Sequence, residues 1–308
     1  MNKANDIIFR YLADSDLPEK EKQEVLKAVS ERTKSQINIL ITGAAGCGKT
    51  STINALFNTE AAKIETSTEP ETMNITKYKF ENLTLWETGL GDGLETDIRH
   101  GAAIKELLAK KDENGELLID IVAVILDGSS KDMEASYEFI RTIIAPCLQD
   151  NTRLIIGINW TDQALKGLCW NKETHKPEAK LMRFLMKNEK TVGKRIKKAA
   201  GITVKPVSYA AGFKEEGEPQ VSSYNLSKLL LYIIDSIPEQ KRLDIADCLN
   251  EDKALWARND EMEDYDQRID SSLMVGILTA LFMNRDFCQS RKGTIWDTQL
   301  IPIDSLLQ

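Results

Sequence analysis

The sequence predicts a doubly wound, mostly parallel α/β sheet with helical segments at both ends of the chain. Short apolar runs alternate with longer amphipathic stretches, as in a sheet that carries helices on both faces. The first run, residues 37–42, leads directly into a glycine-rich turn and then into a helical pattern. Residues 117–128 form a continuous apolar run, which is typical of a strand buried on both faces.

The predicted elements follow one another in the order that such a sheet requires. Apolar period and β-branched content predict strands over residues 37–42, 75–80, 83–88, 117–128, 152–160 and 202–212. Helical patterns occupy residues 51–60, 94–108, 129–144, 162–200 and 225–237. Only Glu81 and Asn82 separate the second strand from the third, so we expect a tight antiparallel hairpin near one edge.

The chain divides into three expected parts. Residues 1–35 form a charged helical segment, residues 36–240 hold the sheet and its helices, and residues 241–308 form an acidic helical segment. The most apolar run of the last part, Leu273–Met283, is too short to span a bilayer. We interpret it first as a packed helix, and second as a helix for a membrane surface or a partner.

Composition narrows the class of protein. The 308 residues carry a formal charge of -8, with 42% apolar and 29% charged residues, as in an ordinary globular chain. An acidic chain is a poor general binder of nucleic acids or anionic membranes. The five cysteines form no CxxC pair, and no apolar leader opens the sequence, so we expect a cytoplasmic protein with free thiols.

The glycine-rich turn matches the pattern GxxxxGK[ST]. A polyphosphate needs many backbone amides pointing inward, which requires a loop with almost no side chains, followed by a helix N-terminus. Lys49 is expected between the β- and γ-phosphates, the Thr50 hydroxyl on Mg²⁺, and Ser51 at the α-phosphate. The residues expected to contact phosphate are Gly43, Ala44, Ala45, Gly46, Cys47, Gly48, Lys49, Thr50 and Ser51.

The side chain of Cys47 allows two interpretations. Lys49 and the helix N-terminus would lower the pKa of a nearby thiol and make it reactive. A small side chain pointing into the core is the plainer interpretation.

Several stretches together carry a resemblance to a known family. They are "GAAGCGKTSTINALFN", "WETGLGDG", "ILDGSSKDMEASYEFI", "INWTDQALKG" and "NLSKLLLYIIDSIPEQKR", and they span residues 37–242. The chain resembles the Era-like P-loop GTPases of the TRAFAC class, and more closely a bacterial, often prophage-encoded subgroup of them. The resemblance implies a Ras-like P-loop NTPase fold, GTP as substrate, GDP as product and Mg²⁺ as cofactor.

The resemblance also implies a guanine site. The family reads guanine with Asn-Lys-x-Asp after a buried strand, and this chain has Asn159-Trp160-Thr161-Asp162 there. Asp162 would accept from the guanine N1 and exocyclic amine, and Asn159 would brace the loops. Trp160 departs from the family lysine, and its indole would stack on the base. In "SYAAG" the Ala211 amide would donate to the guanine O6.

Two further segments resemble the family's switches. In "TEPETMNI" the threonine that ligates Mg²⁺ maps to Thr72, with Thr66 and Thr68 as rivals. The second switch begins with Glu87 instead of aspartate and is one residue shorter before its glycine. Glu87 would hold a metal-bound water, and either Gly89 or Gly91 would contact the γ-phosphate.

These features predict a GTPase that acts as a nucleotide-dependent switch. Slow intrinsic turnover is expected, because Leu90 and Asp92 stand near the place of the glutamine that orients water in Ras-type enzymes. Relatives that use a potassium ion in hydrolysis hold it with an asparagine where this chain has Gly46, so the resemblance does not favour a potassium-assisted reaction here. We expect a protein partner or a second copy at the switches and C-terminal helices, and no DNA; peripheral membrane contact stays open.

Two other functions fit parts of the sequence. A P-loop ATPase or kinase would use Asp127, after the apolar run, as a metal acid. A pseudo-GTPase would hold nucleotide without hydrolysing it, as the altered second switch allows. The downstream process has no signature in the sequence.

Overall fold

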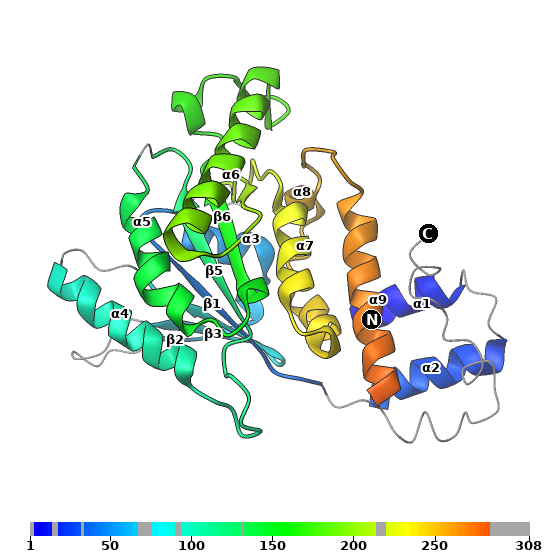
Figure 1. Ribbon diagram of the computed structural model, residues 1–308. Coiled ribbons are helices and arrows are strands. Elements are labelled where there is room, and N and C mark those ends of the chain that lie inside the picture. The colour runs from blue at the N-terminus through cyan, green and yellow to red at the C-terminus, as the bar shows by residue number, and fades with distance from the viewer. Residues whose placement is uncertain are drawn as a thin grey trace.

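The computed structural model describes residues 3–13, 18–31, 34–66, 75–89, 94–130, 132–213 and 220–283. A seven-stranded sheet, ordered β2-β3-β4-β1-β5-β6-β9, lies at its centre (Figure 1). The strands of this sheet are β1 (Ile37–Gly43), β2 (Lys63–Thr66), β3 (Thr76–Lys79), β4 (Leu83–Glu87), β5 (Ile121–Asp127), β6 (Leu154–Asn159) and β9 (Val207–Ser208). Four neighbouring pairs are parallel, and β2–β3 and β3–β4 are antiparallel. The prediction of a doubly wound, mostly parallel sheet is confirmed.

Helices connect the strands and extend beyond them at both ends of the described chain. The α-helices are α1 (Lys3–Ala13), α2 (Glu19–Glu31), α3 (Lys49–Leu56), α4 (Leu94–Ala109), α5 (Glu134–Phe139), α6 (Ala179–Ala200), α7 (Leu226–Ser236), α8 (Lys253–Trp256) and α9 (Tyr265–Met283). A π-helical turn over Ile140–Ile144 continues α5. A 3₁₀ segment over Glu239–Cys248 follows α7.

The two faces of the sheet bury different helices. Alternation along β1 sends Ile37, Ile39 and Ile41 to one side and Leu40 to the other, and all four are at most 2% exposed. The first side packs with α3, α7 and the terminal helices. The second side packs with α4, α5 and α6. The sheet is therefore the middle of three layers, as Figure 1 shows.

The helices from the two ends of the chain lie together beside α7 (Figure 1). Ile8 of α1 and Leu273 of α9 are both buried in the same core as the first face of the sheet. Leu273 begins the apolar run that we interpreted as a packed helix, and α9 contains that run. Within the ranges described, no helix combines the length and the apolar character needed to cross a bilayer.

The structure corrects one predicted helix. Residues 162–200 are not one helix, because α6 begins only at Ala179. A short hairpin precedes it, formed by β7 (Trp170–Asn171) and β8 (Lys176–Pro177). The backbone of Leu165, Lys166 and Cys169 has φ of 53°, 62° and 64°, which a right-handed helix cannot contain.

The edge of the sheet differs from the prediction in one strand. The expected hairpin exists: β3 and β4 pair antiparallel, with the Phe80 amide donating to Leu83 O at 2.8 Å. Outside it lies β2, which the sequence pattern did not reveal. Its charged side chains, including the exposed Lys63 and the partly exposed Glu65, give it the polar character of an edge strand.

Candidate functional site

The glycine-rich turn lies where the predicted phosphate loop requires it, between the end of β1 and the start of α3. Gly43 has φ of +152°, and a Cβ there would lie 2.3 Å from Ile125 O of β5. Gly48 has φ of +88°, and a Cβ there would lie 2.1 Å from Asn159 Nδ2. Both positions therefore need glycine for space as well as for backbone conformation. The loop closes tightly against the two neighbouring parallel strands.

Lys49, the first residue of α3, folds back over this loop. Its Nζ donates to Gly43 O at 3.1 Å and to Ala44 O at 2.9 Å. The ammonium group is thus held at the mouth of the loop by carbonyl oxygens rather than by a carboxylate. A phosphate arriving there would meet a cation whose contacts are neutral groups.

Asn159, at the end of β6, joins two loops that are far apart in the sequence. Its Nδ2 donates to Cys47 O at 3.0 Å, and its Oδ1 accepts from the Ala211 amide at 2.9 Å. The side chain is 2% exposed, so both bonds are buried. Asn159 thus joins the phosphate loop to the turn that contains Ala211.

The same bond changes the expectation for Ala211. Its amide was predicted to donate to a guanine O6, but here that amide is already bonded to Asn159. The turn contains another amide immediately afterwards, at Gly212, where φ is +82° and a Cβ would lie 2.2 Å from Val221 O. The Ala211 amide is thus engaged within the protein in this structure.

Trp160 and Asp162 follow Asn159 at the same edge of the sheet. The Trp160 indole Nε1 donates to Gly46 O at 3.1 Å, so this side chain contacts the phosphate loop. Asp162 is partly exposed, and its carboxylate accepts from Gln163 Nε2 at 2.7 Å. Trp160 and Asp162 thus come directly after β6, the strand whose last residue, Asn159, is bonded to the phosphate loop.

A hydrogen-bonded group of oxygens lies beside the start of α3. The Thr50 hydroxyl donates to Glu87 Oε1 at 2.5 Å, and the Tyr78 hydroxyl donates to Glu87 Oε2 at 2.9 Å. Glu87 ends β4, which pairs with β1 on one side and with β3, carrying Tyr78, on the other. Burial, and then the nearby Glu87 charge, raise the pKa of Tyr78, so the phenol stays a donor.

These hydroxyl and carboxylate oxygens are hard ligands of the kind that Mg²⁺ prefers, so Thr50 and Glu87 fit a magnesium ion shared with a bound phosphate. Within the described ranges, no cluster of three or more His, Cys, Asp or Glu side chains is arranged to hold a metal ion. A metal here would thus depend on oxygens from a ligand as well as from the protein.

The thiol of Cys47 is a buried filler. The side chain is fully buried in the core that contains α3 and α7. Burial raises its pKa to about 11, which outweighs the opposing effect of Lys49. The alternative of a reactive thiolate is therefore wrong.

Asp127, the metal acid of the ATPase interpretation, bonds Ser129, whereas the Thr50 hydroxyl bonds Glu87. Its Oδ1 accepts from the amide of Ser129 at 2.8 Å and from the hydroxyl of Ser129 at 2.6 Å. This carboxylate therefore closes the turn that follows β5. The metal acid expected in the ATPase interpretation is engaged locally.

Several predicted residues are described only in part. Thr72, Thr68 and Gly91 lie outside the described residues. Thr66 ends β2, and Gly89 follows β4 with no atom within 4 Å of a Cβ placed on it. Of the second switch, the structure thus places the acid and the first of the two candidate glycines.

Sequence reasoning missed three residues that hold this site together. Tyr78 positions Glu87. Tyr209 is fully buried and shares a 2.7 Å hydrogen bond with the Thr52 hydroxyl. Gln220 donates to Ser51 O at 3.1 Å and also to Ala211 O. Alternation along β3 places Tyr78 in the sheet but gives no sign of its partner. Gln220 carries no local signal at all.

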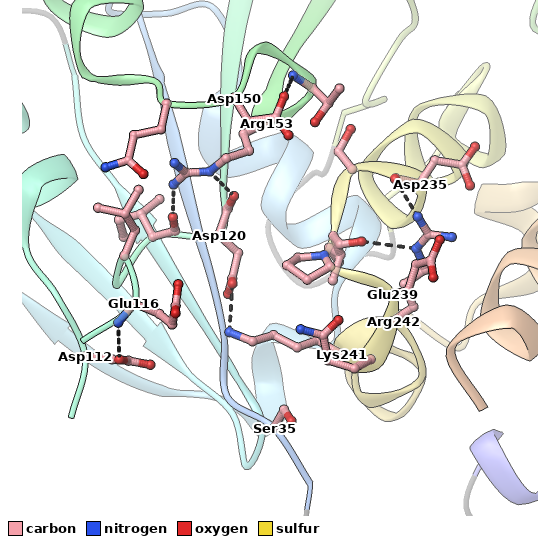
Figure 2. A pocket seen from close by; sticks show the side chains of 18 of the residues that line it. Ser35, Asp112, Glu116, Asp120, Asp150, Arg153, Asp235, Glu239, Lys241 and Arg242 are labelled. Atoms are coloured by element: carbon pink, nitrogen blue, oxygen red, sulfur yellow. Dashed lines mark hydrogen bonds and ion pairs between the residues drawn. The ribbon is translucent and has the colours of Figure 1, made fainter. Parts of the chain in front are cut away.

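A hollow of about 710 Å³ lies away from this site, beside residues that precede β5 and β6. Figure 2 shows Lys241 reaching Asp120, at 2.7 Å, while Arg242 donates to Asp235 O at 2.8 Å, near the end of α7. Arg153 Nε donates to Asp120 O at 2.8 Å. The phosphate loop follows the carboxyl end of β1. The hollow therefore lies at the opposite end of the parallel strands, where their amino ends meet. Its charged groups attach the segment after α7 to that end of the sheet.

No protein-family model and no curated protein matches this sequence. Among solved structures, the chain is similar to the G domain of the FeoB iron transporter from T. maritima, with 16% identity over 65% of this chain and 98% of that chain and a TM-score of 0.36. It is also similar to LeoA, a bacterial dynamin GTPase from ETEC (13% identity, 94% of this chain, 47% of that chain, TM-score 0.41). A third similar structure is Era from Aquifex aeolicus, with 14% identity over 65% of this chain and 56% of that chain and a TM-score of 0.37. Similarities this weak carry no inference about activity, which depends on the residues of this chain.

Proposed function

We propose that this chain is a GTP-binding switch of the Era-like, TRAFAC-class kind that hydrolyses GTP to GDP and phosphate with Mg²⁺. The Asn159 bridge carries this proposal. One buried amide joins the phosphate loop, through Cys47 O, to the turn after β9, through the Ala211 amide. A nucleotide needs both places at once, because its phosphates and its base are bound by different loops.

The phosphates would be held by the amides of residues 43–51, by Lys49 and by the N-terminus of α3. Lys49 supplies a cation at the loop mouth, where it now contacts two carbonyl oxygens. Mg²⁺, when bound, would neutralise phosphate charge; Thr50 would ligate it, Glu87 would hold one of its waters, and Thr72 is the second proposed ligand. These assignments follow the resemblance in the sequence and the oxygen group at Thr50.

Guanine selectivity is assigned to Asp162, with Gly212 in place of Ala211 as the amide donor to O6. A carboxylate pairs with the two adjacent donors of guanine, and adenine offers no such pair. The ATPase alternative has less support, since Asp127 is engaged with Ser129. Competition between GTP and ATP for the purified chain tests this, and preference for ATP would contradict the proposal.

The pseudo-GTPase is a second candidate with an observation in its favour. Glu87, one methylene longer than aspartate, reaches the Thr50 hydroxyl directly at 2.5 Å, and a metal would have to break that bond. Phosphate release under saturating GTP and Mg²⁺ separates the two functions. The expected result for the GTPase is slow release that Lys49→Ala abolishes. Nucleotide binding without release above that control would favour the pseudo-GTPase.

A further inference from the structure

We infer that Trp160 is a positioning residue that couples base recognition to the shape of the phosphate loop, through its indole N–H and not through its ring face alone. This inference rests on the proposed function, because it concerns how the same site receives a guanine nucleotide. It goes beyond the stacking role that the sequence suggested for this side chain.

Two consecutive residues hold two consecutive carbonyls. Asn159 Nδ2 donates to Cys47 O at 3.0 Å, and Trp160 Nε1 donates to Gly46 O at 3.1 Å. Both donors come from the end of β6, and both acceptors belong to the phosphate loop. The loop is thereby fastened to the strand that leads to Asp162.

The bonded atoms are the ones that would oppose a phosphate. A carbonyl oxygen turned toward a polyphosphate repels it, while an amide turned toward it attracts. Occupying the oxygens of Gly46 and Cys47 from outside fixes these peptide groups against rotation. Gly46 has φ of +73°, and a Cβ there would meet nothing within 4 Å, so open space surrounds the side-chain position of this residue. The indole bond restrains its peptide group from the carbonyl side.

The backbone of Trp160 is arranged around this contact. Its φ is 61°, a left-handed conformation that is unfavourable for a bulky residue and persists only where neighbouring contacts impose it. The Gln163 amide donates to Trp160 O at 3.0 Å, and the Gly128 amide donates to Asn159 O at 2.8 Å, on either side of the turn. The turn that aims the indole at Gly46 is the turn that leads to Asp162.

An indole offers one neutral, directional donor in place of a hydrated ammonium group. Its contribution can therefore be removed without removing the ring. Trp160→Phe keeps an aromatic face for a base and deletes the N–H that reaches Gly46. The chain offers a matched control, because Trp256 Nε1 donates to the carbonyl of Asn250 at the same 3.1 Å, away from the phosphate loop.

The test compares Trp160→Phe and Trp256→Phe with the unmodified full chain, by calorimetric titration with GDP and GTP and by hydrogen exchange of the nucleotide-free proteins. We expect Trp160→Phe to weaken both nucleotides about tenfold, the size of one lost hydrogen bond at its upper range. We also expect faster exchange at the amides of residues 44–48. Trp256→Phe should leave both measurements unchanged, and thermal unfolding checks that all three chains are folded.

Two failures are distinguishable. If the unmodified chain binds GDP and Trp160→Phe binds it equally well, the inference is wrong and the proposed function stands; the same holds if exchange at residues 44–48 does not change. If the unmodified chain binds neither nucleotide, the proposed function itself is wrong, and the coupling inferred here fails with it.

Discussion

The Thr50 hydroxyl donates to the Glu87 carboxylate at 2.5 Å. This bond joins the first turn of α3 to the end of β4, two elements that meet only because β4 pairs parallel with β1. The other oxygen of the same carboxylate accepts from Tyr78 at 2.9 Å. Both oxygens of the acid are thus engaged, one by the phosphate-loop side and one by the strand that follows residues 67–74.

Changing the acid at position 87 should separate binding from hydrolysis. Glu87→Gln removes the charge that would orient a metal-bound water, so we expect phosphate release from GTP to fall by about 10–100-fold. GDP binding should change far less, because the amides and Lys49 remain. Glu87→Asp keeps the charge and is the matched control, expected to retain more activity than the amide. Equal phosphate release by Glu87→Gln and the unmodified chain would exclude Glu87 from the reaction.

Removing the Tyr78 hydroxyl should loosen Glu87. Tyr78→Phe deletes a partly buried hydrogen bond to a carboxylate, so we expect a loss of about 1.5 kcal/mol in the free energy of unfolding. A rise in the Mg²⁺ concentration needed for half-maximal phosphate release should accompany it. Tyr137→Phe is the control for the loss of a tyrosine hydroxyl elsewhere in the fold, because the Tyr137 hydroxyl contacts Met133 Sδ, at 3.6 Å, and the side chain of Arg195. An unchanged Mg²⁺ requirement in Tyr78→Phe would limit Tyr78 to a structural role.

The two ends of the phosphate loop should differ in their tolerance of alanine. Gly43→Ala would place a Cβ 2.3 Å from Ile125 O, a backbone atom of the neighbouring strand. Gly46→Ala meets no atom within 4 Å and carries only the strain of a φ of +73°. We expect Gly46→Ala to cost about 1 kcal/mol and Gly43→Ala clearly more. Urea unfolding measures both, and a smaller loss for Gly43→Ala would contradict the packing described.

Cys47 should resist alkylation. Since its pKa is raised from 9.0 to about 11, the thiol is protonated near pH 7.5, and it is fully buried. Peptide mapping after brief iodoacetamide treatment should find Cys169, which is partly exposed, modified well before Cys47. Because the pKa of Cys47 is higher in the folded chain, the thiol's contribution to the free energy of unfolding is fully present below about pH 9. That contribution is lost as the pH rises toward 11. Rapid modification of Cys47 in the folded chain would contradict its burial.

The ion pair between Lys241 and Asp120, at the amino ends of the parallel strands, should stabilise the attachment of the segment after α7. Lys241→Met leaves Asp120, only 5% exposed, without its cation, and we expect a loss of about 3 kcal/mol in the free energy of unfolding. Burial raises the pKa of Asp120, and losing Lys241 raises it further, so the loss should be larger at pH 8 than at pH 5. Lys176→Met, at an exposed pair with Glu261, should cost under about 1 kcal/mol. Equal losses for the two variants would contradict the burial of the Asp120 pair.

Much of the sheet and of the phosphate loop could be predicted from the sequence, because both depend on neighbouring residues. Short continuous apolar runs encode that β1 and β5 are buried on both faces. Likewise, the spacing of Gly43, Gly48 and Lys49 encodes a bare turn before a helix. Edge strand β2 could not be found, because its polar residues are stabilised by pairing with β3 rather than by burial.

The amino-acid sequence by itself determined the alternation of strands and helices, the bare turn and the residue types that can contact a phosphate. Only the tertiary structure decided which of them meet: Asn159 with Cys47 across 112 positions, Tyr78 with Glu87, and the Ala211 amide with Asn159 instead of with a ligand. The physical reason is range. Periodicity and turn chemistry act between residues a few positions apart, whereas a buried hydrogen bond between distant segments exists only where the packed sheet brings their ends together.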